Sequence, residues 1–267
     1  MKWINKKEFG KFSVEEYTED EIIVEKQQNE NEKKKEKENN KKILLLRMND
    51  NENRFNPINL KYINQALDYI ESIDDCCCLI TTGTNESKYY SLGLDLEWVK
   101  PRGKSSFFNL LYDLSVLLER ILMFPIPTIS CINGHSYAGG AIFSLAHDFR
   151  VMNDNKGFIC VNAIDNNIPL PPGLIDTMKC KINNPCLYRD FVLMGKRYGG
   201  LDAEKLQLVD KTSNPSTILE ESIKLAKDIG YKDRLTFSCL KIESYKLISQ
   251  SLLNKDLGQA LKLKIFD

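Results

Sequence analysis

The sequence predicts an α/β domain followed by a C-terminal helical extension. Three observations support this fold class. Short apolar runs that are typical of buried strands alternate with helical patterns, the strand-like runs end near glycine, and the chain beyond Val161 is mostly helical in its spacing. A chain of 267 residues is also long enough to bury a substantial core.

The N-terminal region contains a segment that cannot belong to a core. Residues 26–42 consist only of Lys, Gln, Asn and Glu, and strand patterns flank them at 21–25 and 43–47. Because no apolar side chain offsets the entropy of ordering this segment, we predict a disordered, solvated loop that joins two adjacent strands. A basic binding arm is the alternative, and the interleaved Glu residues count against it.

Periodicity predicts the elements that follow. A helix is expected over 59–73, where Leu60, Ile63, Leu67 and Ile70 share one face. Ser105 and Ser106 are expected to cap the next helix. The further elements alternate between strand and helix over the ranges 76–82 (strand), 107–122 (helix), 127–132 (strand), 141–146 (short helix), 149–152 and 158–161 (strands).

Composition narrows the class of function. Lys plus Arg and Asp plus Glu both number 37, so the formal charge is zero and gives no long-range attraction to nucleic acid or to an anionic membrane. No apolar run reaches the roughly 18 residues that span a bilayer, and the N-terminus has no secretory h-region. The eight cysteines, three of them consecutive at 76–78, form no Cys-x-x-Cys pair. We therefore expect an intracellular, reduced, metal-free and soluble protein.

Two glycine-bearing turns between strand and helix are the candidate site. Residues 90–96 surround Gly93, and residues 133–141 contain Gly139 and Gly140. Small residues let backbone amides approach a ligand, and two such turns could hold a carbonyl oxygen that becomes negative during a reaction. The spacing alone agrees at least as well with tight packing of the glycines. Neither turn has the pattern of a nucleotide-binding loop.

The order of these motifs resembles a known superfamily. Residues 91–96 (SLGLDL), 125–134 (PIPTISCING) and 138–148, which contain Ala138-Gly139-Gly140 and His147-Asp148, follow one another as in the crotonase (enoyl-CoA hydratase/isomerase) superfamily. Within it the chain is most similar to plant-type peroxisomal Δ3,Δ2-enoyl-CoA isomerases. The resemblance covers about residues 11 to 250, is strongest from 88 to 172, and leaves out 26–42.

The resemblance implies a fold and a class of substrate. It implies a spiral of ββα units over residues 11–200 and a C-terminal helical trimerisation region over 201–267. The implied substrate is a fatty acyl-CoA and the implied partner is a second copy of the chain, in a homotrimer or larger assembly. Coenzyme A would enter as part of the substrate, so no cofactor or metal is expected, and neither nucleic acid nor membrane insertion is implied.

The resemblance also assigns the site. The thioester oxygen would lie between the backbone N–H groups of Leu94 and Gly139, and two such fixed donors stabilise an enolate oxygen by roughly 3 kcal/mol each. The residues that would bind the substrate around them are Ser91, Leu92, Gly93, Asp95, Gly140 and Ala163.

One departure from the family pattern bears on the activity. Hydratases of the superfamily carry two catalytic Glu residues and isomerases keep the later one, but the two positions here are Ile142 and Ala163. General acid–base catalysis contributes roughly 10²–10⁴-fold. If the segment is extended, Asp165 would point to the same side as Ala163 and could act as a substitute base; His135 is the other candidate. Asn162 cannot act as a base.

These residues leave three functions open. The first is a Δ3,Δ2-enoyl-CoA isomerase of fatty acid β-oxidation that has a substitute base. The second is a catalytically silent subunit that binds acyl-CoA, and the third is an enoyl-CoA hydratase, against which Ile142 argues. Similar isomerases are peroxisomal, whereas this chain ends in Lys264-Ile265-Phe266-Asp267 rather than in a Ser-Lys-Leu-type signal, which leaves the cytoplasm as the alternative.

Several other residues have a structural interpretation beside a functional one. We expect His147-Asp148 to form a strand entry, with Asp148 bonded to local backbone. Lys196 and Arg197 could contact CoA phosphates, although a solvated surface pair is the simpler interpretation. Glu97 and Trp98 could line the acyl pocket. Asn167 stands where the family usually has Gly, and Asn tolerates a positive φ.

Overall fold

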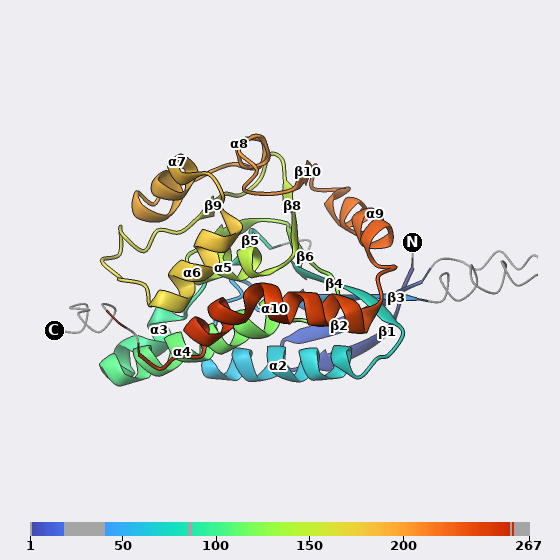
Figure 1. The fold of residues 1–267 in the computed structure, drawn as a ribbon, viewed down its shortest axis with the longest axis horizontal. Coiled ribbons are helices and arrows are strands. Elements are labelled where there is room, and N and C mark those ends of the chain that lie inside the picture. Colours follow the sequence, from blue (N-terminus) through green and yellow to red (C-terminus); the bar gives the residue numbers. More distant parts are fainter. Residues whose placement is uncertain (1, 19–40, 85–86, 257, 259–267) are drawn as a thin grey trace, which may run out of the picture.

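A computed structural model describes residues 2–18, 41–84, 87–256 and 258 (Figure 1). The strand predicted over 21–25 and the loop predicted over 26–42 lie outside the described residues, except for Lys41 and Lys42. Lys42 is the first residue of a strand rather than the last residue of a loop.

The largest element is a sheet of seven strands in the order β1-β2-β3-β4-β6-β8-β10. The first three strands pair antiparallel and the others parallel. Their bounds are β1 (Lys2–Phe9), β2 (Phe12–Thr18), β3 (Lys42–Met48), β4 (Cys76–Gly83), β6 (Thr128–Ile132), β8 (Phe149–Asn153) and β10 (Lys211–Ser213). The strand predictions from 43 to 153 are thereby confirmed, whereas β1 and β2 were missed.

A second, smaller sheet has three short parallel strands in the order β5-β7-β9. They are β5 (Tyr89–Ser91), β7 (His135–Tyr137) and β9 (Ile159–Cys160). Each one directly follows a strand of the large sheet, and each is followed by a helix. The chain therefore repeats a unit of strand, strand and helix, as the resemblance implied.

The helices cover the faces of the large sheet. Their bounds are α2 (Pro57–Glu71), α3 (Leu96–Val99), α4 (Gly103–Leu122), α5 (Gly139–Ala146), α6 (Pro172–Lys181), α7 (Pro185–Tyr188), α8 (Gly200–Lys205), α9 (Ile218–Ile229) and α10 (Arg234–Leu252), with single turns of 3-10 helix at Lys100–Arg102 and π-helix at Arg189–Leu193. The predicted apolar face of α2 is confirmed, and Asn56 caps this helix by accepting a hydrogen bond from the N–H of Asn59 at 2.9 Å.

The capping prediction for α4 is wrong. This helix begins at Gly103, so Ser105 and Ser106 lie inside its first turn and cap nothing. Ser106 instead donates its hydroxyl to the carbonyl oxygen of Arg102 at 3.2 Å. Ser and Thr hydroxyls satisfy backbone carbonyls inside helices in this way.

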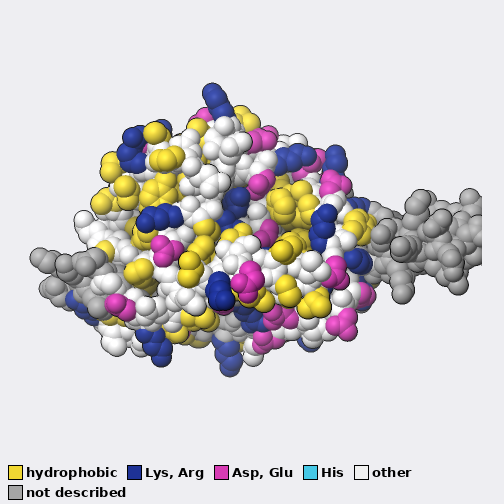
Figure 2. All heavy atoms as spheres, viewed as in Figure 1, with side chains coloured by type: hydrophobic (Ala, Val, Ile, Leu, Met, Phe, Trp, Pro, Cys, Tyr) yellow, Lys and Arg dark blue, Asp and Glu magenta, His cyan; other side chains and the backbone are white. Residues whose placement is uncertain are grey.

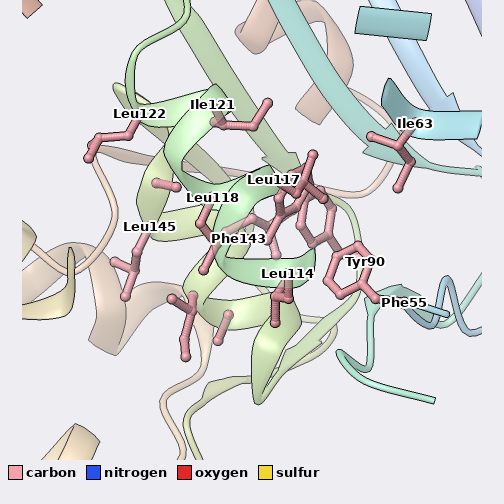
Figure 3. Close-up of a cluster of buried hydrophobic side chains, with 14 of the residues drawn as sticks. Phe55, Ile63, Tyr90, Leu114, Leu117, Leu118, Ile121, Leu122, Phe143 and Leu145 are labelled. Atoms are coloured by element: carbon pink, nitrogen blue, oxygen red, sulfur yellow. The ribbon is translucent and has the colours of Figure 1, made fainter. Parts of the chain in front are cut away.

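The core has two parts because the central strands are buried on both faces. One part lies between the sheet and helices α2, α4 and α5, where Phe55 and Phe143 pack edge to face at 5.5 Å and Tyr90 stacks on Phe143 (Figure 3). The other lies under α9 and includes Ile80, Ile129, Val151, Cys77 and Cys78. Cys76, Cys77 and Cys78 are free and buried, which confirms their interpretation as small core residues.

The C-terminal region is attached to the rest of the fold through α9, α10 and β10. Helix α10 packs against α4 and α6 (Figure 1), and its Lys241 forms a buried ion pair with Asp148 at 2.9 Å. Strand β10 pairs with β8, so the segment beyond residue 200 contributes a strand to the large sheet as well as helices. Within the described residues, no helix combines the length and apolar character that a membrane span requires.

Candidate active site

The two glycine-bearing turns meet at a backbone contact between Gly93 and Gly139. Gly93 has φ +77°, and a Cβ atom on it would lie 2.5 Å from the nitrogen of Gly139. A Cβ on Gly140 would lie 2.2 Å from the carbonyl oxygen of Ser91. Any side chain at these positions would push the two turns apart. Tight packing, which the spacing allowed, is therefore present, and it also brings two backbone amides to the same place.

The first of these amides belongs to Leu94. The N–H of Phe55 donates to the carbonyl oxygen of Gly93 at 2.7 Å, and the N–H of Asp95 donates to the carbonyl oxygen of Phe55 at 2.9 Å. This bridge uses the groups on either side of the Leu94 N–H. Among the described residues, the Leu94 N–H has no acceptor.

The second amide belongs to Gly139, the first residue of α5. Ala138 precedes it with φ +49°, donates its N–H to the carbonyl oxygen of Cys160 at 2.9 Å, and accepts the N–H of Ile142 at 3.1 Å. A positive φ at a non-glycine residue is strained and is typical of functional sites. The Gly139 N–H finds no acceptor within the described part of the chain, as expected at the first turn of a helix.

Both residues line one cavity of about 340 Å³. Its wall is mainly apolar and comes from both turns, from α4 and α6, and from the loop after β9. The apolar lining residues are Leu92, Leu94, Leu96, Leu111, Leu114, Ala138, Ile142, Val161, Ala163, Ile168, Leu170 and Leu174. The polar and charged ones are Arg54, Glu97, Lys100, Tyr137, Asn162 and Asn166.

The structure places Ile142 and Ala163 in the wall of this cavity. Both side chains therefore lie in the same cavity as the two amides, and neither can carry a proton. Among the described lining residues Glu97 is the only carboxylate, and it pairs with Lys100 at 2.6 Å with both side chains mostly exposed. The interior part of the wall thus holds no general base.

Asp165 is not in the cavity, contrary to the geometry on which its candidacy rested. The segment is a tight turn and not an extended strand, because the carbonyl oxygen of Ala163 accepts the N–H groups of Asn166 at 3.2 Å and Ile168 at 2.9 Å. Asp165 is exposed, and its carboxylate lies against Gly195. Asn167 adopts φ +53° in this turn, which confirms the expectation that Asn replaces glycine there.

His135 also lies outside the cavity. Its Nδ1 accepts the N–H of Phe158 at 3.2 Å, and its ring stacks on Tyr137 with centroids 5.3 Å apart. Partial burial, helped by the charges of Arg197 and Lys88, lowers its pKa below the ordinary 6.5. The imidazole therefore connects β7 to the segment before β9, and it is not placed to act on a substrate in the cavity.

His147 and Asp148 have structural roles, as expected. His147 is fully buried between the carbonyl oxygen of Phe143 at 2.8 Å and the hydroxyl of Thr81 at 2.9 Å, and burial lowers its pKa to about 3. Asp148 accepts the N–H and the hydroxyl of Thr128, both at 2.9 Å, in addition to its ion pair with Lys241. Neither residue lines the cavity.

Most of the other predicted binding residues shape the first turn instead of lining the cavity. Ser91 donates its hydroxyl to the carbonyl oxygen of Asn53 at 2.7 Å and accepts the N–H of Gly93 at 3.2 Å. Asp95 caps α3 by accepting the N–H of Trp98 at 3.0 Å. Leu92 and Ala163 do line the cavity. Ser91, Gly93, Asp95 and Gly140 are thus supports of the two amides.

The charged and aromatic residues that were considered for substrate binding differ in whether they line the cavity. Lys196, Arg197 and Trp98 do not line it, whereas Glu97 does, together with two cations that the sequence did not single out, Arg54 and Lys100. The guanidinium of Arg54 donates to the carbonyl oxygen of Leu94 at 3.4 Å. Two sequence positions could have identified these cations. Arg54 directly follows Asn53, whose carbonyl oxygen binds Ser91 of the first turn, and Lys100 lies four residues after the end of that turn at residue 96.

Similarity to known proteins agrees with this geometry. Residues 38–263 match the model of the enoyl-CoA hydratase/isomerase family. Enoyl-CoA delta isomerase 3 of Arabidopsis thaliana is 28% identical over 189 residues, which cover 68% of this chain and 79% of that protein. The peroxisomal enoyl-CoA delta isomerase 2 of the same plant is 28% identical over 190 residues, with the same shares covered.

Solved structures show the same fold. An enoyl-CoA hydratase from Mycobacterium ulcerans superposes with a TM-score of 0.72 at 22% identity, covering 79% of this chain and 90% of that one. An enoyl-CoA isomerase of Mycobacterium tuberculosis superposes with a TM-score of 0.73 at 20% identity, covering 82% and 94%. The predicted α/β fold of the crotonase type is confirmed, and the chain belongs to the enoyl-CoA hydratase/isomerase family.

Proposed function

We propose that the cavity binds a fatty acyl-CoA with its thioester oxygen between the N–H groups of Leu94 and Gly139. One observation carries the proposal: two backbone amides from separate turns have no acceptor among the described residues, and both residues line one apolar cavity. Donors fixed in this way polarise a carbonyl group and stabilise the enolate that forms from it.

The rest of the cavity suits the other parts of this ligand. Its leucine and isoleucine side chains would surround an acyl chain, which gains roughly 0.8 kcal/mol for each buried methylene group. Arg54 and Lys100 supply positive charge at partly exposed positions, where the phosphates of coenzyme A could bind. Two backbone amides can polarise a thioester without a metal or a redox cofactor. Coenzyme A would enter as part of the substrate.

The activity that best fits the relatives is a Δ3,Δ2 double-bond shift of an enoyl-CoA, at a low rate. Such a shift moves a proton from C2 to C4, and general acid–base groups contribute roughly 10²–10⁴-fold to steps of this kind. Ala163 supplies no base, while Asp165 and His135 lie outside the cavity. A catalytically silent subunit that binds acyl-CoA is the second candidate, and the same observation supports it. Addition of water to a 2-enoyl-CoA is the third candidate, because Ile142 cannot supply the second acid–base group that a hydratase uses.

Two measurements test the proposal. Binding of a saturated acyl-CoA, measured by titration calorimetry, should occur and should weaken when the contact between the turns is disrupted by Gly93→Ala. Isomerase activity toward a 3-enoyl-CoA should rise by about 10²-fold or more in Ala163→Glu and stay at the wild-type level in Ala163→Gln, which has the same size and no charge. A chain that does not bind acyl-CoA refutes the proposal.

The same assays separate the two leading candidates. If the wild type already isomerises the substrate, and Ala163→Glu does not increase that rate, the protein has a base elsewhere. A wild type that binds acyl-CoA but turns over only as Ala163→Glu is a silent subunit. Isomerase activity that disappears in Asp165→Asn would restore Asp165 as the base.

Assembly and location are further proposals. Helix α10 exposes Leu235, Leu240 and Leu247, and Figure 2 shows apolar side chains on the face that carries this helix. Exposed apolar groups on a helix favour burial against another copy of the chain. Because the family resemblance implies a trimer, we propose a homotrimer, which light scattering after gel filtration can test. Two of the Arabidopsis relatives are named as peroxisomal, and a fluorescent fusion in cells would show whether this chain shares that location.

A further inference from the structure

The cavity combines donors for an enolate oxygen with an interior wall in which the described residues supply no base, since Glu97 lies at the exposed part of the lining. Ile142 and Val161 are fully buried, and with Ala163 they form the part of the wall in which a proton acceptor would be needed. A thioester enolate forms when an electron pair is released at C2. A C–H bond releases that pair only to a base, whereas a bond from C2 to a carboxylate group releases it without one, because carbon dioxide leaves.

We infer that this cavity decarboxylates 2-carboxyacyl-CoA thioesters of the malonyl type. The inference rests on the proposed thioester site. The bond between C2 and the carboxylate carbon breaks, its electron pair forms the C1–C2 double bond, and the thioester oxygen takes the negative charge between the N–H groups of Leu94 and Gly139. Carbon dioxide leaves. The enolate then takes a proton from water at C2, which gives the acyl-CoA and hydroxide.

The character of the wall favours this step. The carboxylate of the substrate carries its charge in the ground state and loses that charge as carbon dioxide forms. An apolar wall of Ile142, Val161 and Ala163 solvates the ionised carboxylate poorly, whereas the two amides stabilise the charge at its new position on the thioester oxygen. The same residues that slow proton transfer therefore assist loss of carbon dioxide.

One polar side chain in this wall has an uncommitted amide. Asn162 lies next to Ala163 in the cavity lining, and within the described residues neither its buried Oδ1 nor its Nδ2 has a hydrogen-bond partner. The neighbouring Asn166 donates its own amide to the carbonyl oxygen of Asn162 at 2.9 Å, so it is already engaged. The Asn162 amide N–H can hold a substrate carboxylate as a neutral donor, without the full charge of a lysine or arginine that would stabilise the ground state.

The test uses the purified full chain with malonyl-CoA and methylmalonyl-CoA. Release of carbon dioxide and formation of acetyl-CoA or propionyl-CoA are followed by mass spectrometry. We expect release at least tenfold above buffer, with one solvent deuterium at C2 of the product when the reaction runs in D₂O. Ala163→Glu should lower the rate roughly a hundredfold relative to Ala163→Gln, because the added carboxylate repels that of the substrate.

A second variant keeps the test independent of changes in size at Ala163. Asn162→Asp is isosteric and puts a like charge beside the substrate carboxylate, so it should also lower the rate of decarboxylation roughly a hundredfold. Thermal unfolding of each variant checks that it is folded.

The outcomes separate this inference from the proposed function. A wild type that binds saturated acyl-CoA but releases no carbon dioxide overturns the inference and leaves the thioester site intact. A wild type that binds no acyl-CoA overturns the proposed function itself. Equal rates of decarboxylation in Ala163→Glu and Ala163→Gln would show that the uncharged wall is not what permits the reaction.

Discussion

Replacing Gly93 by alanine should separate the two turns that hold the thioester. The new Cβ would lie 2.5 Å from the nitrogen and 3.0 Å from the Cα of Gly139, and both are backbone atoms that cannot rotate away. Gly103 provides a matched control, because it has a similar φ, +76° against +77°, and a Cβ there meets no atom within 4 Å. Both variants therefore carry the cost of a side chain at positive φ, about 1–3 kcal/mol, and only Gly93→Ala adds a collision with another backbone segment.

The size of the effect follows from the two donors. Each fixed N–H is worth about 3 kcal/mol to a developing oxyanion, so displacing one of them should cost 10²–10³-fold. Calorimetric titration with hexanoyl-CoA measures ground-state binding, and the near-ultraviolet absorption of bound 3-oxohexanoyl-CoA measures how far the site favours the enolate. We expect Gly93→Ala to lose the enolate signal and Gly103→Ala to keep it. If both variants behave alike, backbone strain and not the contact between the turns is responsible, and the proposed oxyanion site is wrong.

Three further predictions concern residues around the site and the core. Asp165→Asn should change acyl-CoA turnover by less than about twofold, because the side chain faces Gly195 and solvent; a kinetic assay that shows a larger loss would place it in the mechanism. Burial lowers the pKa of His147 from 6.5 to about 3, so the neutral imidazole stabilises the fold fully above pH 6.5. This contribution declines by about 1.4 kcal/mol per unit as the pH falls from 6.5 towards 3, and urea unfolding of His147→Gln should lack that slope. Lys241→Met should lower the free energy of unfolding by about 3 kcal/mol, since Asp148 would stay buried with only its Thr128 donors; a double-mutant cycle with Asp148→Asn measures the pair itself.

The sequence predicted the central strands and the long helices because burial leaves a strong pattern. Strand β4 is buried at every residue and is therefore a continuous apolar run, and α2 and α4 show a 3.6-residue period. Strands β1 and β2 were missed because charged residues interrupt their apolar pattern. Strand β1 is the edge strand of the sheet, and β2 lies between it and β3. The cap of α4 was misplaced because Gly103, a poor helix former, begins that helix.

The sequence by itself determined the family and the absence of a carboxylate at Ile142 and Ala163, since both depend only on which residues stand at which positions. Tertiary structure alone decided where Asp165 points. The N–H groups of Asn166 and Ile168 both bond to the carbonyl oxygen of Ala163, and this turn directs Asp165 away from the cavity. Tertiary structure also decided that Gly93 and Gly139 touch. These residues are far apart along the chain, and only the packing of one strand–strand–helix unit on the next brings their amides to one cavity.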